Sequence, residues 1–328
     1  MSAIEHNERM ARLPPGRCSG MTLIELMVAL TIGLFLTWGA IQVYLQSKSN
    51  YRSTEVVTRL QENARFALDT LEPDLRLAGF WGRHRDPGRV SVPAGGIAVT
   101  CDGNDVSAWV LDLANPVDAS DDNYDLGCGA FSTARADSDV LVVRHAGELI
   151  VPPQAGQVQL RSNLARAQLF DDGNEPTGFG AAAETRDLVV HAYYVDNASS
   201  FADDLPSLRR QTLVNGGLVE DQEMITGVEN MQVQFGLDTN GDGRVERYVD
   251  PDDPDADTER IVAVRLWLLV RSEESPGPAF ADNRPYLPPD ANADSIEPGT
   301  ALYPAQFQRL EVTKTVYLRN QAGPQGTR

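Results

Sequence analysis

Oxygen-bearing side chains alternate along one short segment near residue 240. Every second residue from Asp238 to Asp242 carries a carboxylate or an amide, and Gly243 follows where a calcium-binding loop makes its sharp turn. The candidate ligands are the side chains of Asp238, Asn240, Asp242 and Glu246 and the carbonyl of Arg244. Oxygen ligands at this spacing are what Ca²⁺ requires, so the segment is a candidate Ca²⁺ site.

The end of this segment departs from the calcium-loop pattern. Val249 stands where the bidentate Glu is expected, and Asp250, Asp252 or Asp253 could take its place. Both flanks resemble strands, so the segment would close a β-hairpin and is not an EF-hand. Because Asp, Asn and Gly are also the preferred residues of tight turns, a metal-free hairpin turn remains the alternative. The acidic run from 250 to 259 would attract a cation or simply be a solvated charge run.

A single carboxylate, Glu25, stands in the otherwise uncharged apolar run from 21 to 36. A charge at this place is costly in lipid and usually marks a function. The basic residues Arg9, Arg12 and Arg17 precede Gly20, and the apolar run follows it. Cleavage after Gly20 would therefore keep the apolar helix in the mature chain. The alternatives are an ordinary signal peptide cut near residues 37–39 and an uncleaved signal anchor.

The segment from Gly20 to Glu25 resembles the leader junction of type IV pilins and pseudopilins, with Met21 in place of the usual Phe. This resemblance implies that a prepilin peptidase cuts between Gly20 and Met21 and that Met21 is then N-methylated. It also implies that Glu25 pairs with the terminal amine of a neighbouring subunit during assembly. Two opposite charges attract strongly in a medium of low dielectric, which agrees with that role.

A second segment, from Leu60 to Gly82, resembles the PilW group of minor pilins, which is related to the J-type pseudopilin of type II secretion. The resemblance implies a structural, non-catalytic protein that joins the initiating or tip complex of a type IV pilus and supports assembly, adhesion or motility. The implied partners are other minor pilins, the major pilin, the prepilin peptidase and a large tip adhesin. The chain would sit in the inner membrane with a periplasmic head, and later in the filament.

Three alternatives to this function stay open. One is a J-type pseudopilin of a type II secretion system, and another is a calcium-responsive binding module carried on a pilin helix. The third is a membrane-anchored periplasmic enzyme. No H-E-x-x-H, G-x-S-x-G or P-loop motif is present, the four His are scattered, and no organic cofactor is expected. The net charge of −19 argues against direct nucleic-acid binding.

The predicted fold is α+β, with a long N-terminal helix packed on a mainly antiparallel β-sheet head with long loops. The expected parts are a leader (1–20), a helix (21–80) that spans the membrane at about 23–45 and is amphipathic beyond it, a β-rich head (81–320) and a flexible tail (321–328). Pro73 should kink or end the helix, and Gly79 should mark its exit.

Short alternating runs predict the strands of the head. They are 139–144, 187–195, 208–214, 231–236, 260–271 and 308–319. The segments 112–129 and 272–306 are predicted to be loops, the latter extended on the surface. Cys101 and Cys128 form an even pair in an exported chain, which favours a disulfide over two buried free thiols. The third cysteine, Cys18, would leave with the leader.

Overall fold

Helix α1, Leu23–Leu77, is the longest element of the computed structural model. The structure describes residues 20–278, 280–290 and 295–320. Except for Gly20, the predicted leader lies outside these residues, and so does the predicted tail. The chain divides into two units, the first ending at Tyr51 and the second beginning at Arg52. The bounds of the four predicted parts stay predictions.

The part of α1 in the first unit exposes all of its side chains. Apolar residues surround it on every side, and by length and composition α1 contains a segment that could cross a membrane. A helix that is apolar all round needs lipid or other helices around it. This part of the chain therefore has the composition predicted for a membrane span.

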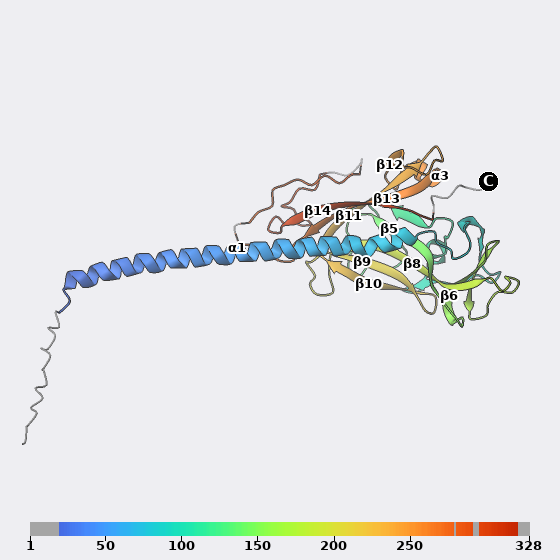
Figure 1. Cartoon of the computed structure of the whole chain (residues 1–328), viewed down its shortest axis with the longest axis horizontal. Coiled ribbons are helices and arrows are strands. Elements are labelled where there is room, and N and C mark those ends of the chain that lie inside the picture. Colours follow the sequence, from blue (N-terminus) through green and yellow to red (C-terminus); the bar gives the residue numbers. More distant parts are fainter. Residues whose placement is uncertain (1–19, 279, 291–294, 321–328) are drawn as a thin grey trace, which may run out of the picture. The chain divides into compact units, whose positions relative to one another are not determined.

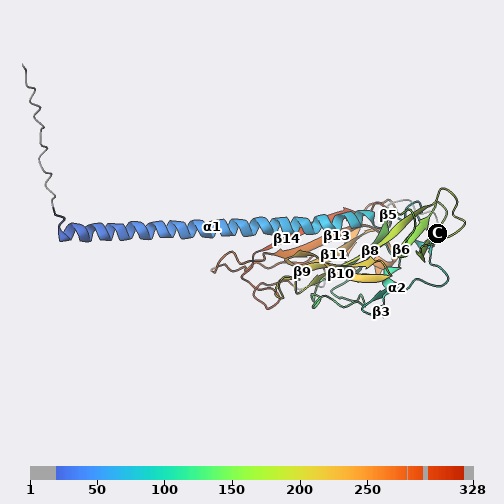
Figure 2. The same cartoon turned by 90° about the horizontal axis from the view of Figure 1, so that it is seen from below.

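The part of α1 in the second unit is amphipathic. Six side chains at spacings of three or four residues are buried: Val56, Leu60, Ala64, Ala67, Leu71 and Leu75. This spacing puts them on one face, which packs against the strands of the head. Figures 1 and 2 show this lighter blue part lying along the sheet strands. The helix runs through Pro73 to Leu77, and Gly79 follows with φ of +73°. The exit was thus predicted correctly, whereas Pro73 does not end the helix.

The remaining elements are short helices and the strands of the head. The helices are a 3₁₀ turn at Pro87–Arg89, α2 at Ser107–Val110 and α3 at Pro254–Thr258. The strands are β1 Val90–Ser91, β2 Thr100–Cys101, β3 Asn104–Asp105, β4 Val117–Ser120, β5 Val140–Leu149, β6 Ala155–Ser162, β7 Ala167–Asp172, β8 Glu184–Asp196, β9 Ser207–Val214, β10 Leu218–Thr226, β11 Val228–Asp238, β12 Arg247–Val249, β13 Arg260–Arg271 and β14 Arg309–Tyr317.

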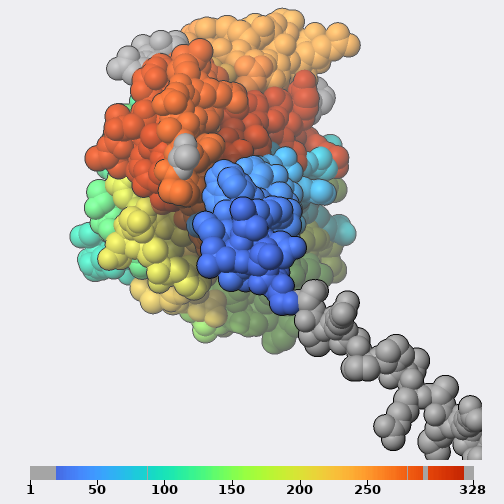
Figure 3. Space-filling model, turned by 90° about the vertical axis from the view of Figure 1, so that its left-hand side faces the viewer, coloured from blue at the N-terminus to red at the C-terminus, as the bar shows by residue number. Residues whose placement is uncertain are grey.

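These strands form two sheets. Among the described residues, the larger sheet has the order β1-β7-β6-β8-β9-β10-β2-β3, with β5 pairing β8 and β4 pairing β5, and the smaller has the order β12-β11-β13-β14. All pairings are antiparallel except β1 with β7 and β2 with β10. Figure 3 shows the orange and red C-terminal segments on one side and the yellow and green strands of the larger sheet on another. The predicted α+β class with a mainly antiparallel head is confirmed.

Strand β5 shows why the larger sheet is buried on both faces. Leu141 and Val143 point into the core that the second half of α1 covers. Val140 and Val142 point into a second core on the opposite face. Successive side chains of a strand point to opposite faces, so an unbroken apolar run requires cover on both sides.

Strand β13 is likewise covered on both faces. Its Leu266, Leu268 and Val270 face the core that α1 covers. On the other face Trp267 and Leu269 form a separate cluster with Tyr286, Ile296 and Tyr303. The segment 272–306 was predicted to be an extended surface loop, and this is only half right. It has no long strand or helix in its described residues, but it covers an apolar sheet face and buries its own aromatic side chains there.

Candidate functional site

The N-terminus of α1 is closed by a reciprocal pair of hydrogen bonds. The backbone N–H of Thr22 donates to Glu25 Oε2 at 3.0 Å, and the backbone N–H of Glu25 donates to Thr22 Oγ1 at 3.3 Å. The Thr22 hydroxyl also donates to the same carboxylate at 2.9 Å. This is a capping box, which satisfies helix N–H groups that have no intrahelical partner. Glu25 is therefore already hydrogen-bonded within its own chain.

The predicted cleavage residues lie directly beside this cap. Gly20 and Met21 are exposed, and a Cβ added to Gly20 would meet no atom within 4 Å. Within the described part of the first unit, nothing therefore shields the bond between Gly20 and Met21. The capping box could have been recognised from the sequence, because Thr22-Leu23-Ile24-Glu25 has the required Thr and Glu three residues apart.

The turn from Asp238 to Glu246 is built by carboxylates that accept backbone N–H groups. Asp238, whose side chain is fully buried, accepts from Gly241 at 2.7 Å and from Gly243 at 2.9 Å. Asp242 accepts from Arg244 at 2.8 Å. The two glycines have φ of +81° and +84°, which only glycine adopts without strain. The turn closes the hairpin of β11 and β12, as the sequence predicted.

Three carboxylates of this turn converge. One oxygen from each of Asp238, Asp242 and Glu246 lies within 4.8 Å of the others. Asn240 joins the same turn through its Nδ2, which donates to Glu246 Oε1 at 2.9 Å. Oxygens gathered in this way are what a hard cation such as Ca²⁺ would need. Arg260 Nη1 lies 3.5 Å from Asp238 Oδ2, so part of the negative charge is already balanced.

The other acidic residues that follow the turn have different partners. Asp250, the candidate for the missing ligand, accepts from Gln234 Nε2 at 2.9 Å and is not part of the converging group. Asp253 caps the short helix α3 by accepting the N–H of Asp255 at 2.9 Å. Arg247 forms ion pairs with Asp253 and Asp255. Much of this acidic run is therefore structural.

Cys101 and Cys128 are joined by a disulfide, with their Cα atoms 5.3 Å apart. Both residues are buried. The bridge ties strand β2 to the loop that follows β4. The predicted disulfide is therefore present.

Asp74 connects α1 to the larger sheet, a contact that the sequence did not reveal. Its carboxylate accepts hydrogen bonds from His191 Nδ1 and from Tyr193 Oη (2.5 Å), both on β8, and His145 Nε2 on β5 lies 3.8 Å away. Burial by itself raises the pKa of Asp74, but the hydrogen bonds of His145, His191 and Tyr193 outweigh it and lower the pKa well below its usual range. Both histidines thus lie against the carboxylate that α1 presents to the larger sheet.

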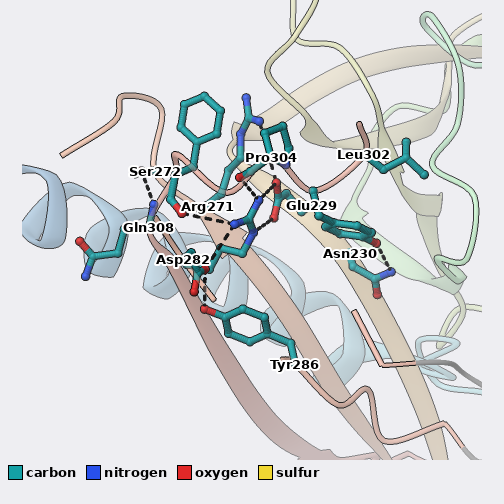
Figure 4. Close-up of polar contacts among 12 residues, drawn as sticks. Glu229, Asn230, Arg271, Ser272, Asp282, Tyr286, Leu302, Pro304 and Gln308 are labelled. Carbon is teal, nitrogen blue, oxygen red and sulfur yellow. Dashed lines mark hydrogen bonds and ion pairs between the residues drawn. The ribbon is translucent and has the colours of Figure 1, made fainter. Parts of the chain in front are cut away.

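A buried ionic network fastens the segment 272–306 to the smaller sheet (Figure 4). Arg309 on β14 donates from Nε and Nη2 to Glu229 on β11, at 2.6 and 3.0 Å. Arg309 Nη1 also lies 3.3 Å from Asp282, whose carboxylate accepts from Tyr286 Oη at 3.0 Å. Both Arg309 and Glu229 have fully buried side chains.

Comparison with known proteins gives two matches along the sequence. Residues 192–320 match the family described as type IV pilus-assembly protein W, and residues 15–41 match the prokaryotic N-terminal methylation motif. No curated protein matches the chain. Among solved structures, a type IV-like pilin from Thermus thermophilus is similar at 14% identity and a TM-score of 0.34, covering 81% of this chain and 100% of that one.

Proposed function

We propose, from the premise that this chain is a PilW-like type IV pilin with a prepilin leader, that it is a minor pilin of the complex that starts a type IV pilus and stays at its tip. There it would support pilus assembly and pilus-dependent adhesion or motility. Its role would be structural, with other minor pilins, the major pilin and a large tip adhesin as partners. The prepilin peptidase would process it in the inner membrane.

The observation that supports this proposal best is the capped, fully exposed apolar helix of the first unit. Every described side chain from 20 to 51 is exposed, and Glu25 is the only charged residue between Met21 and Leu45. Such a surface is stable only in lipid or among other apolar helices. Glu25 would remain in its capping box until the terminal amine of a neighbouring subunit offers it a stronger, charged partner.

Glu25 would have two roles, as the acceptor of the helix cap and as the charge that pairs with a neighbouring subunit, and replacing Glu25 alone removes both. Thr22→Val removes the capping hydroxyl and keeps the carboxylate, whereas Glu25→Ala removes both the cap acceptor and the charge. We expect Thr22→Val to enter sheared pili nearly as well as wild type and Glu25→Ala to be absent from them while still being processed. Glu62→Ala, a change on an exposed part of the same helix, is the matched control. Equal incorporation of Glu25→Ala and wild type would contradict the proposal.

A J-type pseudopilin of a type II secretion system is the alternative within the same structural class. The two are separated by deleting the gene and measuring both surface piliation and protein secretion. Loss of pili with normal secretion supports the minor pilin, and the reverse result supports the pseudopilin.

We propose Ca²⁺ binding at the turn from Asp238 to Glu246 as a second function, supported by the three converging carboxylates. Ca²⁺ would replace backbone N–H groups as partners of these oxygens and hold the hairpin of β11 and β12. In Asp242→Asn we expect at least tenfold weaker Ca²⁺ binding by calorimetry. Asp203→Asn, an exposed acidic residue elsewhere, is the control. Unchanged affinity in Asp242→Asn would exclude this site.

A further inference from the structure

Strand β10 has an outer edge that is largely unpaired. β9 pairs with one side of β10 along its whole length, from Leu218 to Thr226, and Figure 1 shows β10 beyond β9 at the border of the larger sheet. On the other side, β2 pairs with β10 only through Thr100 and Leu218. Among the described residues, the backbone of 219–226 makes no hydrogen bonds other than those of the ladder with β9. Every second N–H and C=O group of this segment therefore points away from β9 without a partner.

A hollow of about 380 Å³ lies against the second half of this edge. It is lined by four consecutive residues of β10 and two of the loop that follows β8: Glu223, Met224, Ile225, Thr226, Ser200 and Phe201. Because neighbouring residues of one strand line it, the hollow lies along the unpaired edge. A further strand would lie about 4.8 Å from β10, so its side chains would enter this space.

Two phenylalanine rings near the hollow are exposed to solvent. Phe201 is 85% exposed and Phe131 is 48% exposed. The backbone N–H of Ser200 donates to Glu223 Oε2 at 2.5 Å, which holds the loop that carries Phe201 against β10. The guanidinium of Arg209, which donates to the same carboxylate at 3.0 Å, lies 3.7 Å from the centre of the Phe131 ring. Both rings are thus placed by fixed contacts, and aromatic side chains on a surface are typical anchors for a protein partner.

The surface around this edge is acidic. β10 carries Glu220, Asp221 and Glu223, and Glu273 Oε1 accepts a hydrogen bond from the hydroxyl of the last residue of β10 at 2.5 Å. Within the described part of the chain, Arg209 is the cation that forms ion pairs with β10, and it contacts both Asp221 and Glu223. The negative charge of these carboxylates therefore exceeds the positive charge paired with it. Complementary charge favours a basic partner, whereas a second copy of the chain would bring the same acidic edge and be repelled.

We propose that the outer edge of β10 binds one extended segment of another protein, which adds a strand to the larger sheet and alternates basic with apolar side chains. Main-chain hydrogen bonds to 219–226 supply the affinity, and the hollow beside Phe201 takes an apolar side chain of the partner. The added strand continues the line of β2, which already pairs with the first residue of the same edge. About eight residues would cover the edge, which is roughly 25 Å long at about 3.3 Å per residue. This inference depends neither on Glu25 nor on the turn at residue 238.

The test uses the full mature chain in detergent and a dye-labelled peptide, acetyl-Lys-Val-Lys-Phe-Lys-Val-Lys-Val-amide, which alternates basic and apolar residues. We expect saturable binding by fluorescence anisotropy and slower hydrogen exchange of the backbone of 219–226 in the complex. The same peptide N-methylated at every residue keeps its charges and side chains but has no edge donors, so it should bind at least tenfold more weakly. A peptide with Glu in place of each Lys should also bind at least tenfold more weakly, because its charge is repelled by the edge.

Variants at exposed positions locate the binding on the chain. Phe201→Ala should weaken binding of the basic peptide at least fivefold, whereas Leu164→Ala, 80% exposed in the turn between β6 and β7, should leave it unchanged. Glu220→Lys should also weaken it, and Glu148→Lys, at an exposed position on β5, is the charge-matched control. The proposal is overturned if the basic peptide does not bind, or if N-methylation or Phe201→Ala leaves its affinity unchanged. A dimer of the chain alone in sedimentation, which Glu220→Lys dissociates, would overturn it in favour of a second copy at this edge.

Discussion

Arg309 and Glu229 form a two-pronged ion pair inside the head, with both side chains fully buried (Figure 4). The pair joins β14 to β11 across β13, which lies between them in the sheet. Arg271 Nη1 and Asp282 lie at its edges, 3.9 Å from Glu229 and 3.3 Å from Arg309. A buried network of this kind specifies one arrangement of the strands and the covering segment, because any other leaves charges unpaired.

Removing one partner of this pair should be strongly destabilising. Arg309→Met leaves the Glu229 carboxylate buried, with Arg271 as its remaining ion-pair partner among the described residues. We expect the free energy of unfolding to fall by about 3–5 kcal/mol. The double variant with Glu229→Met should recover part of this loss, because the buried carboxylate is removed as well, while Arg271 and Asp282 each still lack one partner. Urea unfolding of the two variants measures both effects. The control Arg65→Met breaks an exposed pair with Asp69 and should cost at most about 1 kcal/mol. Equal losses for the buried and exposed changes would contradict this reading.

The contact of Asp74 with β8 should make the stability of the head depend on acidity. The pKa of Asp74 is lower in the folded chain than in the unfolded chain, so the folded state holds fewer protons in that range. The Asp74 carboxylate therefore contributes fully to the free energy of unfolding above the ordinary carboxyl pKa of about 3.9. This contribution is lost as the pH falls toward the pKa that Asp74 has in the folded chain. Asp74→Asn should lose stability at neutral pH, by about 1.5–3 kcal/mol, and show a weaker decline below pH 4.

Urea unfolding between pH 3 and 7 tests this prediction. Asp69→Asn, an exposed carboxylate on the same helix, should leave the pH profile of the wild type almost unchanged. A profile for Asp74→Asn that parallels the wild type would show that Asp74 is not the group responsible.

The disulfide between Cys101 and Cys128 should contribute measurably to stability. It joins residues 27 positions apart, and the loop-entropy model gives about 3–4 kcal/mol for a loop of this size. The variant with both cysteines changed to Ser should melt lower by a corresponding amount. A reducing agent should lower the melting temperature of the wild type and leave that of the variant unchanged. No response of the wild type to reduction would mean that the bridge carries little of the stability.

The sequence predicted those parts of the fold in which local pattern decides the structure. The buried face of α1 follows from its three-to-four spacing, and β13 was predicted with its observed ends because apolar residues fill nearly all of the run between Arg260 and Arg271. Strands β6, β7 and β10 were missed, and so were the short strands β1 to β4. Strand β4 lies in the segment 112–129 and pairs with β5, so the prediction of a loop throughout that segment was wrong. β10 carries mostly polar residues, and its place depends on pairing with β9, where Arg209 on β9 contacts Asp221. The Asn-Gly-Gly sequence at 215–217 is a local hairpin signal that the prediction did not use.

The candidate sites were likewise predictable where neighbouring residues form them, and not where they join distant parts of the chain. The turn at Asp238 and the capping box at Glu25 are contiguous motifs, so their spacing alone indicates their geometry. Asp74 with His191, and Phe131 with Arg209, meet only because strands and loops far apart in the chain are brought together. Asp250 was expected at the turn but instead accepts a hydrogen bond from Gln234 on β11. This contact also depends on strand pairing, which the sequence pattern does not show.

The most direct test of the central claim is the intact mass of the membrane-extracted chain after co-expression with a prepilin peptidase. Wild type should lose residues 1–20 and gain one methyl group at Met21, whereas Gly20→Ala should keep its leader. Gly33→Ala, a second glycine with open space around it in the same unit, should be processed like wild type. Retention of the leader in the wild type would contradict the account, because Met21 would then have no free amine and Glu25 of a neighbouring subunit would lose its partner.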